Sequence, residues 1–318
     1  MKYIITLLSV FCLLSCEREY TPEDLNQNPD IVVEGHIEAG DNPLPPYVIL
    51  TNSLSFFSSV NINTLDNFFV HDAKVVVSDG TKDYTLTELC LNNLTPPQKI
   101  IAAQAFNLNP DSLRNSNLCI YLDLSGQLQG KEGGTYNLTV KKAEKTLTAT
   151  TTIPKGVALD SIVSRITFNN EYDSLRQVRG FLSDPNDTYN AYRIFARNNE
   201  SQLIANGFGS VVDDRLFDGK QSFEFPLNNP VRRNAAPNET EEQKQKRRET
   251  SGLWKVGDTA TFKWCSIDQE HFKFWDTLES ARNNQGPFST YTRVDYNIEG
   301  GLGIWGGYGV RYYTMKIK

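Results

Sequence analysis

Hydrophobic and polar residues alternate in short stretches along most of the chain, a pattern typical of β-strands with one buried face. Residues 31–37, IVVEGHI, form the first such stretch, and Gly, Asp or Asn residues separate it from those that follow. In the first half we expect further strands at 47–51, 73–78, 84–87, 135–140 and 145–153. Pro154 follows the last one, where a proline cannot join a central ladder. This spacing predicts an Ig-like β-sandwich over residues 31–154.

The second half continues the strand pattern and is richer in aromatic residues. We expect strands at 178–182, 191–196, 222–226, 258–264 and 310–317. Residues 155–159 are the expected boundary, and 155–318 the C-terminal β-rich domain. The predicted fold class is mainly β, with two tandem antiparallel β-sandwich-like domains, a short helical insertion in the first and one helix in the second.

Helical signals interrupt the strand pattern in three places. Thr95, with prolines after it and Gln98 at the capping-box position, predicts the start of the short insertion. The spacing of Ser266 and Gln269 predicts a second helix, to about Arg282, whose apolar face includes His271. We interpret His271 as a packed core residue rather than a ligand. The segment 239–250, ETEEQKQKRRET, is either a mobile surface loop or an exposed helix.

Composition narrows the class of protein. The 318 residues carry a formal charge of -6, with 39% hydrophobic and 22% charged residues, so a packed core is expected. The basic cluster Lys244, Lys246, Arg247, Arg248 is surrounded by acidic residues, which favours a solvated surface over phosphate contacts. The sequence contains no long stripe of basic residues, which argues against a nucleic-acid partner.

The N-terminus has the features of a targeting signal. Lys2 precedes an apolar stretch, Tyr3 to Leu14, and Ser15 is a small residue before Cys16. This predicts a signal peptide over residues 1–15. The ending Leu-Leu-Ser-Cys resembles the bacterial lipobox, whose cysteine is diacylated, so Cys16 is the expected lipidation site and membrane anchor. The alternative is an ordinary signal peptide with a chance cysteine. Residues 16–30 would form a flexible tether.

Two cysteines flank the helical insertion. In an exported protein the pairing of Cys90 with Cys119 is natural, and closing a loop of about 30 residues would stabilise the fold by roughly 3 kcal/mol. Two separate buried thiols are the alternative. Cys265 is left over, and we expect it to be buried.

Candidate chemistry is sparse. Three His and five Cys leave little material for a metal cage, and no GxSxG, HExxH or Cys-His arrangement occurs. We therefore expect no catalytic residues, no metal and no cofactor. Five Gly between residues 300 and 307 are not a phosphate loop, because a strand follows them; they permit turns, bulges or close backbone approach. The four Trp (254, 264, 275, 305) indicate either a core or a binding platform, and we favour the core.

Several strings in fixed order carry a family resemblance: the lipobox, IVVEGHIEAG, VSDGTKDYTLTE, GGTYNLTVKKAEKTLTATTTIP and NIEGGLGIWGGYG. Together they resemble a family of Bacteroidetes outer-membrane lipoproteins described as domain of unknown function 4249. The resemblance implies a β-rich protein outside the cytoplasm, often encoded beside TonB-dependent outer-membrane receptors. Acidic residues after Cys16 resemble the surface-export signal of such lipoproteins. Asp-Ser-apolar triplets resemble their O-glycosylation sequon and make Ser112 and Ser161 candidate sites.

These observations favour a non-catalytic binding or accessory lipoprotein of the outer membrane, facing the cell exterior, that works with a TonB-dependent barrel; its ligand is open. A surface adhesin or structural spacer is the alternative, and a hydrolase ranks third. Exposed Trp or Tyr in a cleft would favour binding, whereas buried aromatics would favour a spacer.

Overall fold

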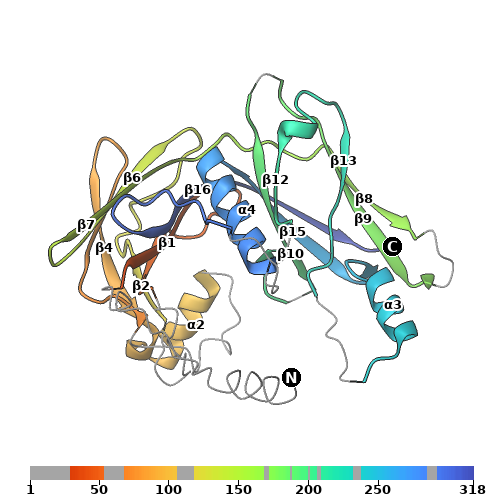
Figure 1. Ribbon diagram of the computed structural model, residues 1–318, viewed down its shortest axis with the longest axis horizontal. Helices are drawn as coiled ribbons and strands as arrows, with labels where there is room; N and C mark the ends of the chain where they lie inside the picture. Colours follow the sequence, from red (N-terminus) through yellow and green to blue (C-terminus); the bar gives the residue numbers. More distant parts are fainter. Residues whose placement is uncertain are drawn as a thin grey trace, which may run out of the picture. The chain divides into compact units, whose positions relative to one another are not determined.

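The computed structural model describes residues 29–53, 68–105, 118–167, 172–186, 188–199, 201–205, 209–231, 238–284 and 292–318. Within these ranges the chain is mainly β, as the alternating pattern predicts, with two sheets and three α-helices (Figure 1).

Seven strands and one helix come from the first half: β1 (Ile31–Gly40), β2 (Tyr47–Asn52), β3 (Lys74–Ser78), β4 (Asp83–Cys90), β5 (Cys119–Leu122), β6 (Thr135–Lys142), β7 (Lys145–Thr152) and α2 (Pro96–Ala105), with the 3-10 turn η4 (Leu91–Asn93). Residues 83–86 of β4 pair with β3, and residues 87–90 pair with β5. The strands enclose a first hydrophobic core, which includes Val75, Leu138 and Leu147. In β3, β6 and β7 the alternating pattern buries one side of the strand.

The second half supplies β8 (Ser161–Ile166), β9 (Leu175–Leu182), β10 (Ala191–Asn198), β11 (Ile204–Ala205), β12 (Val211–Asp213), β13 (Phe223–Pro226), β14 (Trp254–Lys255), β15 (Thr259–Ile267), β16 (Leu302–Lys316), η7 (Asp214–Leu216), α3 (Glu241–Glu249) and α4 (Gln269–Asn283). β8, β9, β13 and β14 form the smaller sheet. A second core, with Val178, Ile194 and Trp264, lies between this sheet and one face of β10 and β15. α4 contacts β10, β12 and β16.

β16 joins the two halves. It pairs antiparallel with β15 and parallel with β1, and His36 lies opposite Gly306 in the register. The parallel pairing differs from the antiparallel arrangement expected, because alternation reveals which face is buried but not strand direction. Trp305 belongs to the first core, whereas Tyr313 packs against the second. The described residues from Asp30 onward belong to one compact unit, and the predicted domain division at residue 154 stays a prediction.

The helices begin close to the predicted positions. Gln98 Oε1 accepts hydrogen bonds from the backbone N–H and hydroxyl of Thr95, as expected for the start of α2. α4 begins later than predicted, since β15 continues to Ile267 and the Ser266 hydroxyl accepts the N–H of Val157 instead. Its cap is Asp268, whose carboxylate accepts the N–H of His271.

Segment 239–250 takes the exposed-helix alternative. Thr240 and Gln243 form a capping box at the start of α3, and none of the helix's side chains is buried. The described part of the second half therefore contains two α-helices, α3 and α4, rather than the single helix expected. None of the helices in the described ranges is long and apolar enough to span a bilayer.

Candidate functional site

The predicted site residues differ in what the structure says of them. Cys16 and Ser112 lie outside the described residues. Cys90 and Cys119 are joined by a disulfide between neighbouring positions of β4 and β5. Ser161 is exposed at the start of β8, where a glycan would remain solvated, and its modification stays a prediction.

The tryptophans are mostly core residues. Trp254, Trp264 and Trp305 are at most 1% exposed, and only Trp275, on α4, is half-buried. The platform alternative is therefore wrong for the first three.

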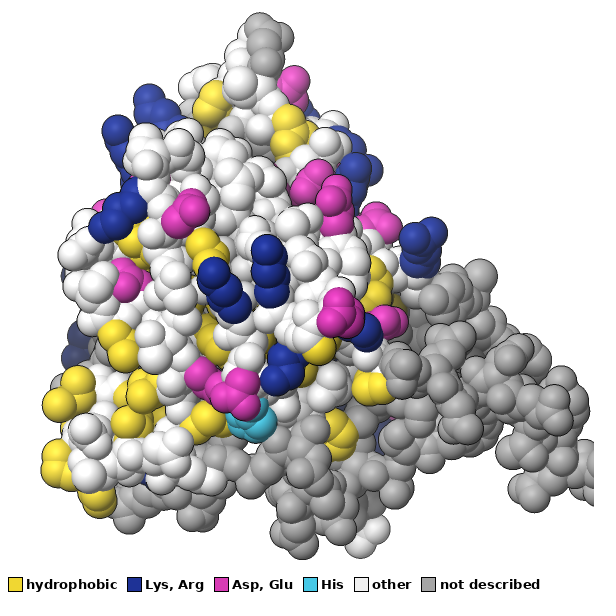
Figure 2. Space-filling view, turned by 90° about the vertical axis from the view of Figure 1, so that its left-hand side faces the viewer, with side chains coloured by type: hydrophobic (Ala, Val, Ile, Leu, Met, Phe, Trp, Pro, Cys, Tyr) yellow, Lys and Arg dark blue, Asp and Glu magenta, His cyan; other side chains and the backbone are white. Residues whose placement is uncertain are grey.

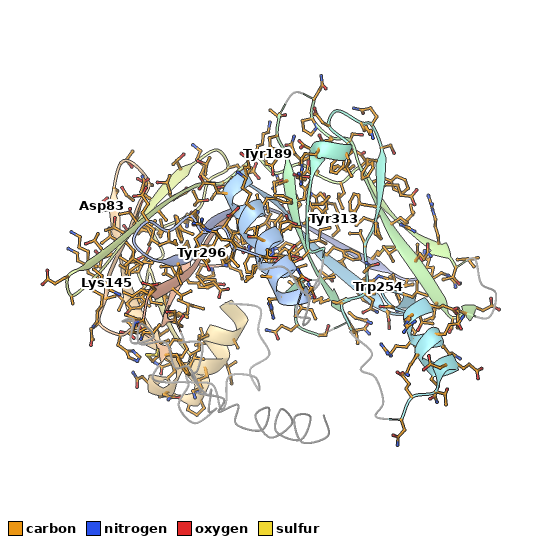
Figure 3. The ribbon with its side chains drawn as sticks, viewed as in Figure 1. Asp83, Lys145, Tyr189, Trp254, Tyr296 and Tyr313 are labelled. Atoms are coloured by element: carbon orange, nitrogen blue, oxygen red, sulfur yellow. A yellow bond between two sulfur atoms is a disulfide. The ribbon has the colours of Figure 1, made fainter. Side chains whose placement is uncertain are left out.

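A surface hollow of about 820 Å³ lies between α4, β7 and the segment that leads into β16. We call it the α4–β7 groove and define it by the residues Thr148, Ala149, Thr150, Glu270, Lys273, Arg293, Val294, Asp295, Tyr296, Asn297, Ile298, Glu299, Gly301 and Leu302. Tyr296 is 45% exposed and its ring lies 6.3 Å from that of Phe274, beside α4 (Figure 3). It is an exposed aromatic residue in a hollow, the feature expected of a binding protein.

The walls of the groove are held in place by hydrogen bonds. The Asn297 side chain donates to the carbonyl of Trp305 and accepts its N–H, at 2.8 and 2.9 Å. The Asp295 N–H donates to the Thr277 hydroxyl of α4. Thr148 of β7 and Glu299 form a two-residue bridge. Because these bonds link the segment to both walls, the groove is preformed.

The groove carries charges of both signs. Glu270, Lys273, Arg293 and Asp295 are exposed, and none forms an ion pair with another described residue. Exposed charges of both signs suit recognition of a polar partner, because they can form complementary pairs across an interface. On the face that Figure 2 shows, basic and acidic side chains also lie among uncharged ones.

A buried polar layer lies beneath α4. Arg193 of β10 donates to the Tyr308 hydroxyl of β16 at 2.6 Å, and its guanidinium lies 3.3 Å from the Trp275 ring centroid. Lys263 of β15 and Glu38 of β1 form an ion pair at 2.5 Å with both side chains at most 6% exposed. Sequence reasoning missed this layer. The sequence signal that could have revealed it is a charged residue within a strongly apolar predicted strand, such as Lys263 in ATFKWC.

Burial sets the ionisation of this layer. His271 is fully buried, as expected, and burial, with His36 and Arg193 nearby, holds the pKa of its imidazole well below the ordinary value. Burial likewise raises the pKa of the Cys265 thiol to about 12. Because the thiolate is the nucleophile and Cys265 is fully buried, we expect its thiol to be unreactive at neutral pH.

The basic cluster of α3 is partly neutralised by its own neighbours. Lys244 pairs with Glu241 at 2.6 Å and Arg247 with Glu239 at 3.1 Å. Arg248 borders a second hollow, of about 580 Å³. Lys244 and Arg247 remain partly exposed in these ion pairs, as expected for a helix that faces solvent.

A family model matches residues 17–314 of the chain. The chain belongs to this family, the domain of unknown function DUF4249. The match confirms the family resemblance drawn from the sequence strings. The DUF4249 region includes both halves and the whole α4–β7 groove, whereas the lipoprotein context of the resemblance stays a prediction. No curated protein matches the chain.

Proposed function

We propose that the chain is a non-catalytic, lipid-anchored binding protein of the outer membrane, facing the cell exterior and working as an accessory partner of a TonB-dependent transporter. The α4–β7 groove carries this proposal, because it combines fixed walls, exposed charges of both signs and the exposed ring of Tyr296. Tyr and Arg are enriched at protein–protein interfaces, and charged groups can form complementary pairs across them.

The anchor supplies the second part of the mechanism. Acyl chains on Cys16 would hold the chain at the membrane, and the tether over residues 16–30 would let it reach a neighbouring barrel. Confinement raises the effective concentration of the partner, so a modest affinity at the groove suffices.

The competing candidate is an adhesin or structural spacer. Its support is the full burial of Trp254, Trp264 and Trp305 and the shared strand β16, which make a stiff body. A spacer needs no particular groove, so groove variants distinguish the two functions.

The test is co-purification from native membranes in mild detergent. The affinity-tagged wild-type chain should bring down an outer-membrane barrel, and Lys273→Glu with Arg293→Glu should abolish this. Lys74→Glu with Lys255→Glu, exposed positions outside the groove, is the matched control and should retain the barrel. A wild-type chain that elutes alone, or a groove variant that keeps its partner, would contradict the proposal.

A further inference from the structure

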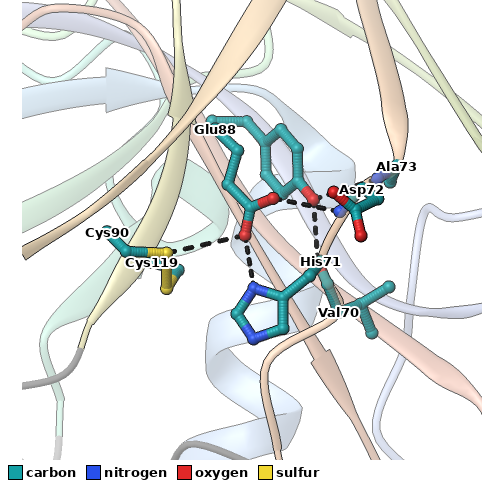
Figure 4. Close-up of a disulfide and its surroundings, with 8 residues drawn as sticks. Val70, His71, Asp72, Ala73, Glu88, Cys90 and Cys119 are labelled. Atoms are coloured by element: carbon teal, nitrogen blue, oxygen red, sulfur yellow. Dashed lines mark hydrogen bonds and ion pairs between the residues drawn. A yellow bond between two sulfur atoms is a disulfide. The ribbon is translucent and has the colours of Figure 1, made fainter. Parts of the chain in front are cut away.

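Four potential metal ligands meet at one end of β4 and β5. The donor atoms of His71, Glu88, Cys90 and Cys119 all lie within 4.8 Å of one another, although 48 residues separate the first from the last in sequence (71 to 119). Figure 4 shows the imidazole and the carboxylate facing the disulfide. The sequence gives few histidines and cysteines, but the fold gathers three of them here.

The two strands place three of these side chains on one face. Cys90 and Cys119 are cross-strand partners, and Glu88 precedes Cys90 by two residues, which puts both on the same side of β4. The Glu88 carboxylate lies 3.6 Å from the Cys90 sulfur.

The fourth ligand comes from the segment before β3. Tyr121 of β5 holds this segment, since its hydroxyl donates to the Val70 carbonyl and accepts the N–H of Ala73. His71 Nδ1 thereby lies 2.5 Å from Glu88 Oε1. Asp72, at a left-handed φ of 52°, directs its N–H to the other oxygen, Glu88 Oε2, at 3.0 Å. One carboxylate oxygen is thus oriented by the backbone, and the other faces the cluster.

The kinds of donor in this set are those of a tetrahedral zinc site. His71 Nδ1 and Glu88 Oε1, 2.5 Å apart in the structure, would have to separate for both to bind one ion. Zinc takes thiolate, imidazole and carboxylate ligands at about 2.0–2.3 Å, which places the ligand atoms roughly 3.3–3.8 Å apart. In the structure the two sulfurs are bonded to each other and unavailable as thiolates. A hollow of about 440 Å³ opens onto the same residues, and His71 is 46% exposed, so an ion has access.

We propose that reduction of the Cys90–Cys119 disulfide by a dithiol creates a Zn²⁺ site formed by His71, Glu88, Cys90 and Cys119. In the first step the dithiol transfers two electrons and two protons to the disulfide, giving two cysteine thiols and the oxidised, cyclic disulfide of the reductant. In the second step Zn²⁺ binds both sulfurs, His71 and Glu88, and releases the two thiol protons. The site is independent of the proposed function, and the disulfide masks it until a reductant arrives.

The test uses Co²⁺ as a spectroscopic probe of the full chain carrying Cys12→Ser and Cys16→Ser. The chain is reduced with dithiothreitol, desalted without oxygen and titrated. The reduced chain should bind a single Co²⁺ ion with a thiolate-to-cobalt charge-transfer band, and the oxidised chain should show none. Cys90→Ser with Cys119→Ser should abolish the band even though Cys265 remains. His71→Ala and Glu88→Gln should each weaken binding at least about tenfold, since losing even an outer partner of a ligand costs this much. Asp83→Asn, an exposed carboxylate on the same strand, should change nothing.

Three results would overturn the proposal: a folded reduced chain that binds no Co²⁺, a charge-transfer band unaffected by both His71→Ala and Glu88→Gln, and a reduced chain whose far-ultraviolet circular dichroism shows loss of the fold. Protection against heat provides a second readout, because an ion that binds only the folded chain must raise the Tm of the reduced form.

Discussion

The imidazole of His271, on α4, lies directly against Gly306 of β16, where any β carbon would overlap the ring. The ring also lies 4.6 Å from that of Tyr308, two residues further along β16. The missing side chain at 306 therefore sets how closely α4 approaches the sheet. Since α4 is one wall of the α4–β7 groove, this contact also positions the groove.

Gly306→Ala should destabilise the fold by about 1–3 kcal/mol, the usual cost of overpacking a core. Urea unfolding of the single variants and of Gly306→Ala with His271→Ala forms a double-mutant cycle. The cost of the alanine at 306 should largely vanish when the imidazole is absent. Equal costs in both backgrounds would show that the methyl group meets something other than His271.

The stability of the fold should fall in mild acid because of His271. Its pKa is depressed in the folded chain, whereas the unfolded chain has the ordinary value near 6.5. Below that pH the unfolded state binds a proton that the folded state does not, so acid favours unfolding; above it both are neutral and the effect is absent. One such group costs on the order of 1 kcal/mol at pH 5.5. The free energy of unfolding of His271→Gln should fall less between pH 7.5 and 5.5; an equal fall in both chains would refute the assignment.

Lys263→Met should destabilise the chain by about 3–5 kcal/mol, because it leaves the Glu38 carboxylate buried without its cation. Adding Glu38→Met should restore most of the loss. Lys244→Met, which breaks the exposed pair with Glu241, should change stability by at most about 0.5 kcal/mol. Chemical denaturation of the four chains checks this; a small effect of Lys263→Met alone would mean that water reaches Glu38.

Much of the fold is predictable from local pattern. Runs such as 135–140 and 145–153 alternate cleanly, and the structure has β6 and β7 there. Short strands escaped prediction: β5, four residues with three of them buried, and β12, three residues of intermediate burial, show too few alternations. The parallel pairing of β1 with β16 was also beyond local pattern, because its partners lie about 270 residues apart in the chain.

The candidate sites were less predictable, because each brings together residues that lie far apart in the sequence. The groove joins residues near 150, 270 and 300, and the His71 cluster depends on a segment held by Tyr121 from another strand. Of the four residues in the His71 cluster, only Cys90 and Cys119 were predicted to lie together, because they flank the helical insertion. Conversely, the glycine run around residue 306 allowed us to predict a close backbone approach. It did not reveal that the side chain packed against Gly306 is that of His271.

Cys16→Ser should release the chain from the membrane. In cells labelled with radioactive palmitate, the wild-type chain should carry the label and sediment with the outer membrane. The variant should lose the label and move to the soluble fraction, because acyl chains on Cys16 would supply the binding energy. A variant that sediments like the wild type would show that anchoring does not depend on this cysteine.

Crosslinking from the groove tests the proposed partnership most directly. A photoreactive phenylalanine in place of Tyr296 should, on illumination of intact cells, form a covalent adduct with a TonB-dependent barrel, identified by mass spectrometry. The same residue in place of Ile166, which is 66% exposed on β8, should not. If position 296 gives no adduct, or both positions give the same one, the α4–β7 groove is not the surface that binds the barrel.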